Sequence, residues 1–253
     1  MLTRQRKQEI LERLRSHGQI VAKDLSREWQ VSEDTIRRDL RELAREGHLQ
    51  RVHGGALPAS RALGDLKLRA ELAPDEKRAI AEAAVELIEP GQVLFFDGGT
   101  TTLALAQALP ADLPVTVVTH SPAIAVALNV HPRIEVVLLG GRMFKHSGVT
   151  MGAATLDAIR AIRADAYFLG VTGVHPELGL TTGDLEEAHI KRALIESAAD
   201  VVLMATADKI GRGSPYVIAP ASALTSLLTS EAADGEVLAA LRGLGIEVHC
   251  VTA

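Results

Sequence analysis

The sequence of 253 residues contains one cysteine, few aromatic residues and no long apolar run, and each scarcity excludes a class of protein. Cys250 alone cannot close an intramolecular disulfide or form a Cys-rich metal site, so a reducing compartment is expected. Because aromatic residues make up only 3%, binding of nucleic acid through stacked rings is disfavoured. The charged start of the chain lacks the apolar run of a signal peptide or a membrane span, so we expect a cytoplasmic protein without membrane association.

The charge that is present is unevenly distributed along the chain. The whole sequence has a formal net charge of −5, yet residues 1–55 carry 12 Lys and Arg against 9 Asp and Glu, while the remainder carries 15 against 23. Between these parts lies a stretch of poor apolar periodicity, which is punctuated by Pro58, Ser60, Gly64 and Pro74. With 47% hydrophobic residues to supply cores, we predict three parts: a domain at 1–56, a linker at 57–75 and a second domain at 76–253.

The first domain has the pattern of three helices followed by a short strand or hairpin. Apolar residues share one face of a helix over 4–16, which Gly18 would end, and a second short helix covers about 22–29. Ser32 is placed to cap a third helix, and residues 48–56 then alternate before two glycines.

The third helix has an apolar stripe and a basic face. The stripe is formed by Ile36, Leu40 and Leu43, and the opposite side carries Arg37, Arg38, Arg41 and Arg45. Such a helix, preceded by two others, fits the major groove of DNA, where arginine contacts guanine edges or phosphates. An ordinary solvated face remains the alternative, because Asp34, Arg38 and Glu42 are spaced as i,i+4 ion pairs.

From residue 76 the pattern changes to short apolar strands that alternate with amphipathic helices. Strands are predicted at 93–96, 115–119, 134–139, 166–171, 201–204 and 247–251. Helices are predicted at about 76–88, 101–109, 121–129, 153–163, 185–198 and 234–243. This alternation predicts an α/β domain with a largely parallel sheet covered on both faces, where ligands bind beyond the carboxyl ends of the strands.

The turn after the first of these strands has the features of an anion site. Asp97 and two glycines form the turn, and Thr100, Thr101 and Thr102 open a helix whose free N–H groups can donate to a phosphate or carboxylate. Turns of this kind also occur without a ligand. The turn is neither G-x-G-x-x-G nor a Walker loop, which disfavours NAD and ATP. The nine histidines show no metal-ligand spacing, so no cofactor and no metal are expected.

Polar and cationic residues recur after the other predicted strands. The candidate binding residues there are Ser121, Gly140, Gly141, Arg142, Glu187, Lys191 and Lys209. A single Lys or Arg is more often a solvated surface residue, but recurrence at one rim of a sheet favours a binding site.

Residues 31–56, VSEDTIRRDLRELAREGHLQRVHGGA, closely resemble the start of the DeoR family of bacterial transcriptional regulators. In that family the pattern VS-x-x-TIRRDL with a following HGGA marks a winged helix-turn-helix. The resemblance and the helix face together imply these candidate DNA contacts: Ser32, Thr35, Arg37, Arg38 and Arg41 on the helix, and Arg51 and His53 on the wing.

The second domain is similar to the DeoR sensor domain, whose fold resembles sugar-phosphate isomerases and CoA transferases. The resemblance implies that a phosphorylated sugar or related effector is surrounded by Asp97, Gly99, Thr100, Thr101, Ser121, Gly140, Gly141, Glu187, Lys191 and Lys209. Three positions depart from the family pattern. His120 stands where Asn is usual, and Thr172 stands where an acidic residue is common. In the run 206–209, the acidic residue stands at a different position from the one it has in the family pattern. The identity of the effector therefore stays open.

These observations predict a transcriptional repressor of a sugar or carbohydrate operon that leaves its double-stranded DNA operator when the effector binds, with no catalytic residues of its own. One helix-turn-helix makes few contacts, so a homodimer or homotetramer on repeated half-sites is expected. Two alternatives stay open: a ligand-dependent activator, and a sugar-phosphate isomerase-like enzyme with a DNA-binding appendage.

Overall fold

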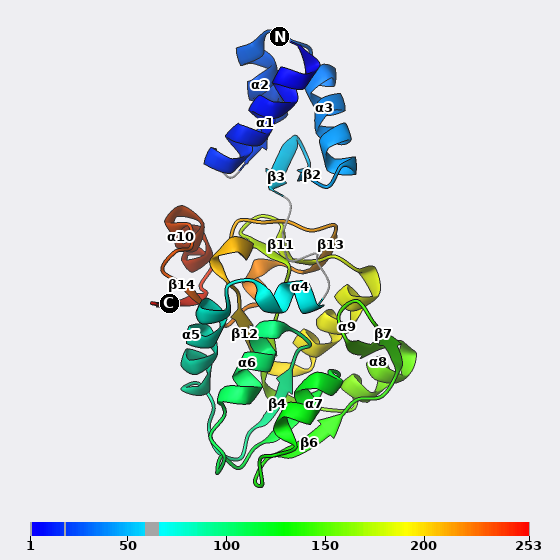
Figure 1. Ribbon diagram of the computed structural model, residues 1–253, viewed down its shortest axis with the longest axis vertical. Coiled ribbons are helices and arrows are strands. Elements are labelled where there is room, and N and C mark those ends of the chain that lie inside the picture. Colours follow the sequence, from blue (N-terminus) through cyan, green and yellow to red (C-terminus); the bar gives the residue numbers. More distant parts are fainter. Residues whose placement is uncertain (1, 18, 59–65, 253) are drawn as a thin grey trace.

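The computed structural model describes residues 2–17, 19–58 and 66–252, which form two units (Figure 1). The N-terminal unit contains three helices and an antiparallel sheet in the order β1-β3-β2. Its elements are α1 (Thr3–His17), β1 (Ile20–Val21), α2 (Ala22–Trp29), α3 (Glu33–Arg45), β2 (Leu49–Val52) and β3 (Gly55–Pro58). The three predicted helices and the hairpin are confirmed, while Gly18, predicted to end the first helix, lies outside the described residues.

The three N-terminal helices pack around the apolar core that their periodicity predicts. Its buried side chains include those of Ile10, Leu14, Ile36, Leu40 and Leu43. As predicted, Ser32 caps α3, because its side chain accepts a hydrogen bond from the Thr35 amide at 3.1 Å. The third helix therefore turns its apolar stripe inward and its arginines outward.

A buried ion pair joins α1 to α3. The Arg6 guanidinium donates to both carboxylate oxygens of Asp39, and the two side chains are only 6% and 0% exposed. Because a buried charge without its partner is costly, this pair fixes how α3 lies against α1.

The C-terminal unit is built on a parallel sheet of seven strands in the order β15-β14-β12-β9-β4-β5-β6. The strands are β4 (Val93–Phe96), β5 (Thr116–Thr119), β6 (Glu135–Leu138), β9 (Ala164–Leu169), β12 (Ala198–Met204), β14 (Ser226–Ser230) and β15 (Glu247–Val251). The predicted α/β fold is confirmed, and six strands lie within three residues of their predicted bounds. The prediction missed β14, which is buried along its length although only Leu227 and Leu228 are apolar.

Helices cover both faces of this sheet (Figure 1). One face carries α5 (Pro74–Val85), α6 (Thr100–Ala108) and α7 (Pro122–Leu128), and the other carries α8 (Ala153–Arg160), α9 (Leu185–Glu196) and α10 (Gly235–Gly243). Alternate strand residues serve the two faces, so Phe95 contacts Tyr167 on one face and Phe96 contacts Phe168 on the other. Among the described residues, no helix is both long enough and apolar enough to span a membrane.

The order of the strands reverses between β4 and β9. From β4 the chain continues outward through β5 to β6, and it then returns to β9 on the other side of β4 and continues through β12 and β14 to β15. In open parallel sheets, such a reversal leaves a crevice at the carboxyl ends of the two central strands, where ligands bind.

Smaller elements follow the strand ends. β7 (Arg142–Phe144) and β8 (Val149–Met151) form a hairpin, and β10 (Gly173–His175), β11 (Gly179–Thr182) and β13 (Tyr216–Ala219) form an antiparallel sheet. Two 3-10 turns, η2 (Ala207–Lys209) and η3 (Ala221–Ala223), follow β12 and β13.

The segment predicted as a linker, 57–75, contains regular structure. Leu57 is buried in β3, and α4 (Leu66–Glu71) lies beside α6 (Figure 1). Residues 59–65, with Ser60 and Gly64, lie outside the described part of the chain. The domain bounds 1–56 and 76–253 stay a prediction.

Replacing Asp39 with alanine is expected to destabilise the N-terminal unit by about 3–5 kcal/mol, because Arg6 keeps its buried charge and loses this carboxylate. Urea unfolding followed by the fluorescence of Trp29, the only tryptophan in the sequence, measures this loss. Glu33→Ala is the control, since Glu33 pairs with an Arg37 side chain that is 56% exposed and should contribute less than about 1 kcal/mol. A loss in Asp39→Ala no larger than in the control would contradict the importance of the buried pair.

Candidate nucleic-acid interface and anion pocket

The outward face of α3 presents the four arginines predicted from the sequence. All four are exposed, and Arg37 pairs with Glu33 one turn earlier at 2.6 Å. The other three form no ion pair within the described residues, because Glu42, which the spacing could pair with Arg38, contacts Lys7 of α1 at 2.8 Å. Three guanidiniums are thus available for phosphates or base edges.

The β2–β3 hairpin forms a wing beside α3. Arg51 and His53 are exposed on it. Gly55 keeps the wing close to β1, because a Cβ at this position would lie 1.8 Å from a backbone carbonyl oxygen of that strand. At the start of α3, the hydroxyls of Ser32 and Thr35 lie 2.8 Å apart. The predicted contact residues therefore belong to one small unit, on α3 with its N-cap and on the wing.

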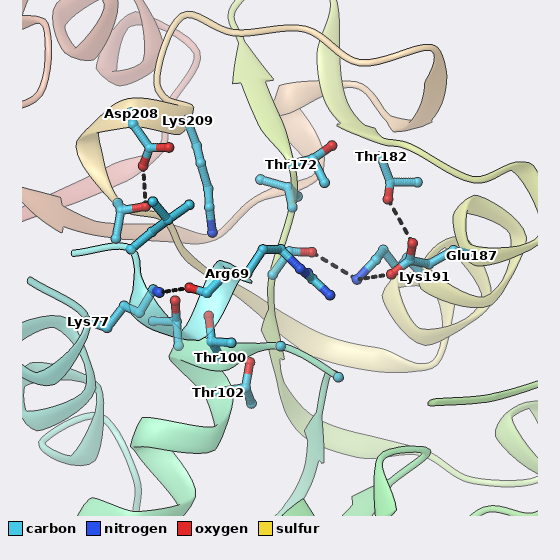
Figure 2. A pocket seen from close by; sticks show the side chains of 17 residues that line it. Arg69, Lys77, Thr100, Thr102, Thr172, Thr182, Glu187, Lys191, Asp208 and Lys209 are labelled. Atoms are coloured by element: carbon cyan, nitrogen blue, oxygen red, sulfur yellow. Dashed lines mark hydrogen bonds and ion pairs between the residues drawn. The ribbon is translucent and has the colours of Figure 1, made fainter. Parts of the chain in front are cut away.

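A cavity lies at the reversal of strand order, beyond the carboxyl ends of β4, β9 and β12 (Figure 2). Its wall combines the turn and helix start after β4, the turn after β9 and the η2 turn, with side chains of α4, α5 and α9. The sequence candidates that meet there are Gly99, Thr100, Thr101, Thr102, Glu187, Lys191 and Lys209. Residues from widely separated parts of the chain thus share one site.

The start of α6 offers unpaired donors to this cavity. Gly99 is the N-cap residue and has no side chain with which to cap the first amides of the helix. Thr101 and Thr102 are buried, and their hydroxyls have no hydrogen-bond partner among the described residues. An oxyanion at this position can accept hydrogen bonds from both the hydroxyls and the helix amides.

The cavity lining is net positive. Four cations face two carboxylates, and these residues are Arg69, Lys77, Lys191 and Lys209 against Glu187 and Asp208. Burial lowers the pKa of Lys209 to about 8; Asp208 opposes this shift, and the neighbouring cations add to it. Burial likewise lowers the pKa of Lys77. No group of His, Cys, Asp or Glu in the described part of the chain could hold a metal ion. The cavity therefore suits an anion, which would relieve the repulsion between these cations.

An ion pair behind the cavity wall joins the two sides of the strand reversal. Asp97 is fully buried and accepts hydrogen bonds from the Lys191 ammonium and, at 2.8 Å, from the Gly170 amide after β9. Lys191 also donates to the Gly170 carbonyl at 3.0 Å. Burial disfavours the ionised carboxylate, but Lys191, with His120 and these hydrogen bonds, outweighs it and keeps the pKa of Asp97 below its ordinary value.

His120 is buried beside this pair. Its Nε2 lies 3.8 Å from Asp97 Oδ1, and its Nδ1 has no partner in the described residues. Burial lowers the pKa of His120 to about 4, although the Asp97 carboxylate opposes the shift. The imidazole is therefore neutral near pH 7.

Five sequence candidates lie outside the cavity wall: Asp97, Ser121, Gly140, Gly141 and Arg142. A Cβ at Gly141, where φ is +152°, would lie 2.2 Å from Thr155 Oγ1, so packing accounts for this glycine. Arg142 pairs at the surface with Glu186. A direct contact of these five residues with an effector stays a prediction.

Two cations of the cavity are absent from the sequence candidates. Lys77 lies near the start of α5, where the helix dipole favours acids, and this electrostatic conflict is the signal that could identify it. Arg69 belongs to the segment predicted as a linker and has no such signal. The sequence therefore identified only part of the cationic lining.

Comparison with known proteins gives matches over both parts of the chain. Residues 6–62 match the DeoR-like helix-turn-helix domain, and residues 72–231 match the DeoR C terminal sensor domain. The chain is 35% identical over 251 residues to the HTH-type transcriptional regulator GlpR of Haloferax volcanii, with 98% of each chain covered. It is 36% identical over 211 residues to the glycerol-3-phosphate regulon repressor of Escherichia coli K12, covering 83% of this chain and 84% of that protein.

A solved structure also aligns over most of the chain. It is that of the full-length sorbitol operon regulator SorC from Klebsiella pneumoniae, with a TM-score of 0.43 and 14% identity. The alignment covers 98% of this chain and 96% of that one.

His120→Asn is expected to weaken the loss of stability in acid. The folded-state pKa of His120 is about 4 against an ordinary value of 6.5, so between these values the unfolded chain binds more protons at this site. Above pH 6.5, His120 leaves the free energy of unfolding unchanged. As the pH falls from 6.5 to about 4, His120 lowers the free energy of unfolding by up to about 3 kcal/mol. Urea unfolding followed by circular dichroism measures the slope.

The exposed His53 provides the matched control, and His53→Asn should keep the wild-type slope. If His120→Asn also kept that slope, His120 would not be the group that titrates.

Proposed function

This chain belongs to the DeoR family of transcriptional regulators, and on that premise we propose that it is a repressor of a sugar or carbohydrate operon. In this proposal a phosphorylated sugar or a related anionic metabolite binds in the cavity and releases the protein from its operator. The observation that carries the proposal is the combination, in one chain, of an exposed arginine face with a separate net-positive cavity.

The arginine face supports DNA binding through α3. The helix enters the major groove in this proposal, with Ser32 and Thr35 near phosphates at its start and Arg37, Arg38 and Arg41 along the groove. Arg51 and His53 then lie over the neighbouring backbone. The net charge of +3 on residues 1–55 assists association with the phosphates.

The cavity supports an effector that carries a phosphate. Its threonine hydroxyls and helix amides suit a compact oxyanion, and its cations supply the opposite charge. One relative is named the glycerol-3-phosphate regulon repressor, and we extend this class of compound to the present chain. The protein would act in the cytoplasm, where both the operator and the phosphorylated metabolites are present.

Repression needs two linked features beyond the single site. A coupling of about 1–3 kcal/mol between effector and operator is sufficient for a switch. Because one helix-turn-helix makes few contacts, we propose that a homodimer or homotetramer binds repeated half-sites.

Arg38→Ala is expected to weaken binding to an operator selected from a random DNA pool. If Arg38 contacts a phosphate, affinity falls equally for all sequences and the dependence of log K on log salt becomes shallower by about 1. If it reads a base, the loss of about 1–3 kcal/mol is confined to one operator position. Fluorescence anisotropy over a salt series distinguishes these results.

Two variants serve as comparisons in this experiment. Arg37→Ala should lose less, because Arg37 already pairs with Glu33. Arg160→Ala, which removes an exposed arginine from α8 of the other unit, should bind as the wild type does. Unchanged affinity in both α3 variants would refute the assignment of α3 as the DNA-contacting helix.

Lys209→Ala is expected to retain operator affinity and to lose the response to the effector. A thermal-shift screen of phosphorylated sugars and polyols identifies the ligand, because a compound that binds only the native state stabilises it. Anisotropy then measures the release of DNA from wild type, Lys209→Ala and the control Lys145→Ala, whose lysine is exposed in the turn after β7.

Other outcomes of the DNA-release measurement would change the proposed role of Lys209 or of the protein. Retained release in Lys209→Ala removes Lys209 from the binding site. An effector that strengthens DNA binding shows an activator, and sustained turnover of the compound shows an enzyme.

A further inference from the structure

The side chain of Arg69 enters the cavity from α4, the helix between the two units in the chain (Figure 2). Its Nε and Nη2 are buried and have no hydrogen-bond partner among the described residues. Burying guanidinium donors without an acceptor is costly. The position of Arg69 therefore calls for an acceptor inside the cavity.

The groups around Arg69 do not supply that acceptor. No carboxylate in the described part of the chain forms an ion pair with it, although Glu187 and Asp208 both line the cavity. The nearest charged neighbours include cations, because Arg69 adds to the lowering of the pKa of both Lys77 and Lys209. An anion bound between these cations would satisfy the guanidinium and reduce their repulsion.

We propose that Arg69 binds the anionic group of the effector, so that the segment joining the two domains forms one wall of the effector site. This inference rests on the proposed function of the cavity. The start of α6 donates from one side through Thr101 and Thr102, and Arg69 donates from α4 through its planar fork. Phosphate, with several acceptor oxygens, is the group that both sides can bind at once.

The same geometry links the bound anion to the DNA-binding unit. The Lys77 ammonium donates to the backbone carbonyl of Arg69, which ties α4 to the start of α5. In the other direction, α4 is the first described element after the wing strand β3. An anion that holds Arg69 fixes the position of α4, and a preference of the effector for this arrangement would shift the population of DNA-binding states.

The test measures anion binding by the full-length protein, with inorganic phosphate and sn-glycerol 3-phosphate as probes and glycerol as the uncharged comparison. Isothermal titration at constant ionic strength compares wild type with Arg69→Gln, Arg69→Lys and Lys209→Ala. Arg133→Gln is the matched control, because Arg133 is exposed just before β6, at the amino end of the sheet. Hydrogen exchange of residues 66–73 in the wild type reports whether the amides of α4 become better protected on binding.

We expect Arg69→Gln to bind both phosphate probes about 10- to 100-fold more weakly, as the loss of a charge-assisted fork predicts. The affinity of Arg69→Lys, which keeps the charge without the planar fork, should lie between those of the wild type and Arg69→Gln. The affinity of Arg133→Gln should match that of the wild type. Without anion, Arg69→Gln should be as stable as the wild type or more stable, because it removes one of several mutually repelling cations. Phosphate should slow exchange in residues 66–73.

The results that would contradict the role of Arg69 differ from those that would contradict the proposed function. If Arg69→Gln binds the probes as tightly as the wild type while Lys209→Ala does not, the role of Arg69 is overturned and the proposed function stands. If the wild type binds neither probe, both are overturned. If Arg69→Gln is strongly destabilised without anion, Arg69 is a structural residue and the inference is wrong. The same conclusion follows if phosphate does not slow hydrogen exchange of residues 66–73 in the wild type.

Discussion

The ion pair between Asp97 and Lys191 is the interaction on which the geometry of the cavity depends. Asp97 directly follows β4 and Lys191 comes from α9, and both bind the backbone of Gly170, which directly follows β9. One buried pair therefore holds together the two strand ends that separate at the reversal of the sheet. Because Asp97 neutralises Lys191 behind the wall, the remaining cations determine the positive character of the cavity.

The cavity is also connected to the wing through the loop that follows η2. Thr172 lines the cavity, and its hydroxyl pairs with the Ser214 hydroxyl at 2.7 Å. The preceding Gly213 lies under the DNA-binding unit, since a Cβ there would be 3.5 Å from Gln50 Cγ and 3.6 Å from Leu57 Cδ1. The loop therefore lies between the cavity wall and the wing, and its residues give one contiguous series of contacts between them.

The sequence predicted those features that depend on local periodicity. The stripe of Ile36, Leu40 and Leu43 determines which face of α3 is exposed, so the arginine face followed from spacing alone. The strand at 93–96, with four consecutive apolar residues, was found at its correct bounds. In contrast, β14 has two leucines between hydroxyl residues, and it is buried only because strands pair with it on both sides.

The site was predictable in part for the same reason. Residues at the carboxyl ends of predicted parallel strands must meet, which is why Thr100 and Lys209 were identified together. Arg69 could not be found in this way, because its place depends on how a short helix outside the sheet packs on α6. Among the five candidates outside the cavity wall, packing accounts for Gly141 and Arg142 pairs with Glu186 at the surface, and the contact of these candidates with an effector stays a prediction.

The electrostatics of the cavity favour binding over proton transfer. A general base must reach a substrate proton with a pKa near the working pH. Asp97 is buried behind the wall and held ionised by Lys191, and His120 is neutral but enclosed, so neither faces a ligand. Glu187 does line the cavity, but its carboxylate accepts from the Thr182 hydroxyl at 3.1 Å and lies 3.8 Å from Lys191. The remaining donors of the cavity lining, the threonine hydroxyls and the cations, can stabilise a bound anion, and Lys209, with its pKa of about 8, is mostly protonated near pH 7. A fold that brings strand ends together can thus serve as a sensor, because its charge is arranged to hold a ligand and not to transform it.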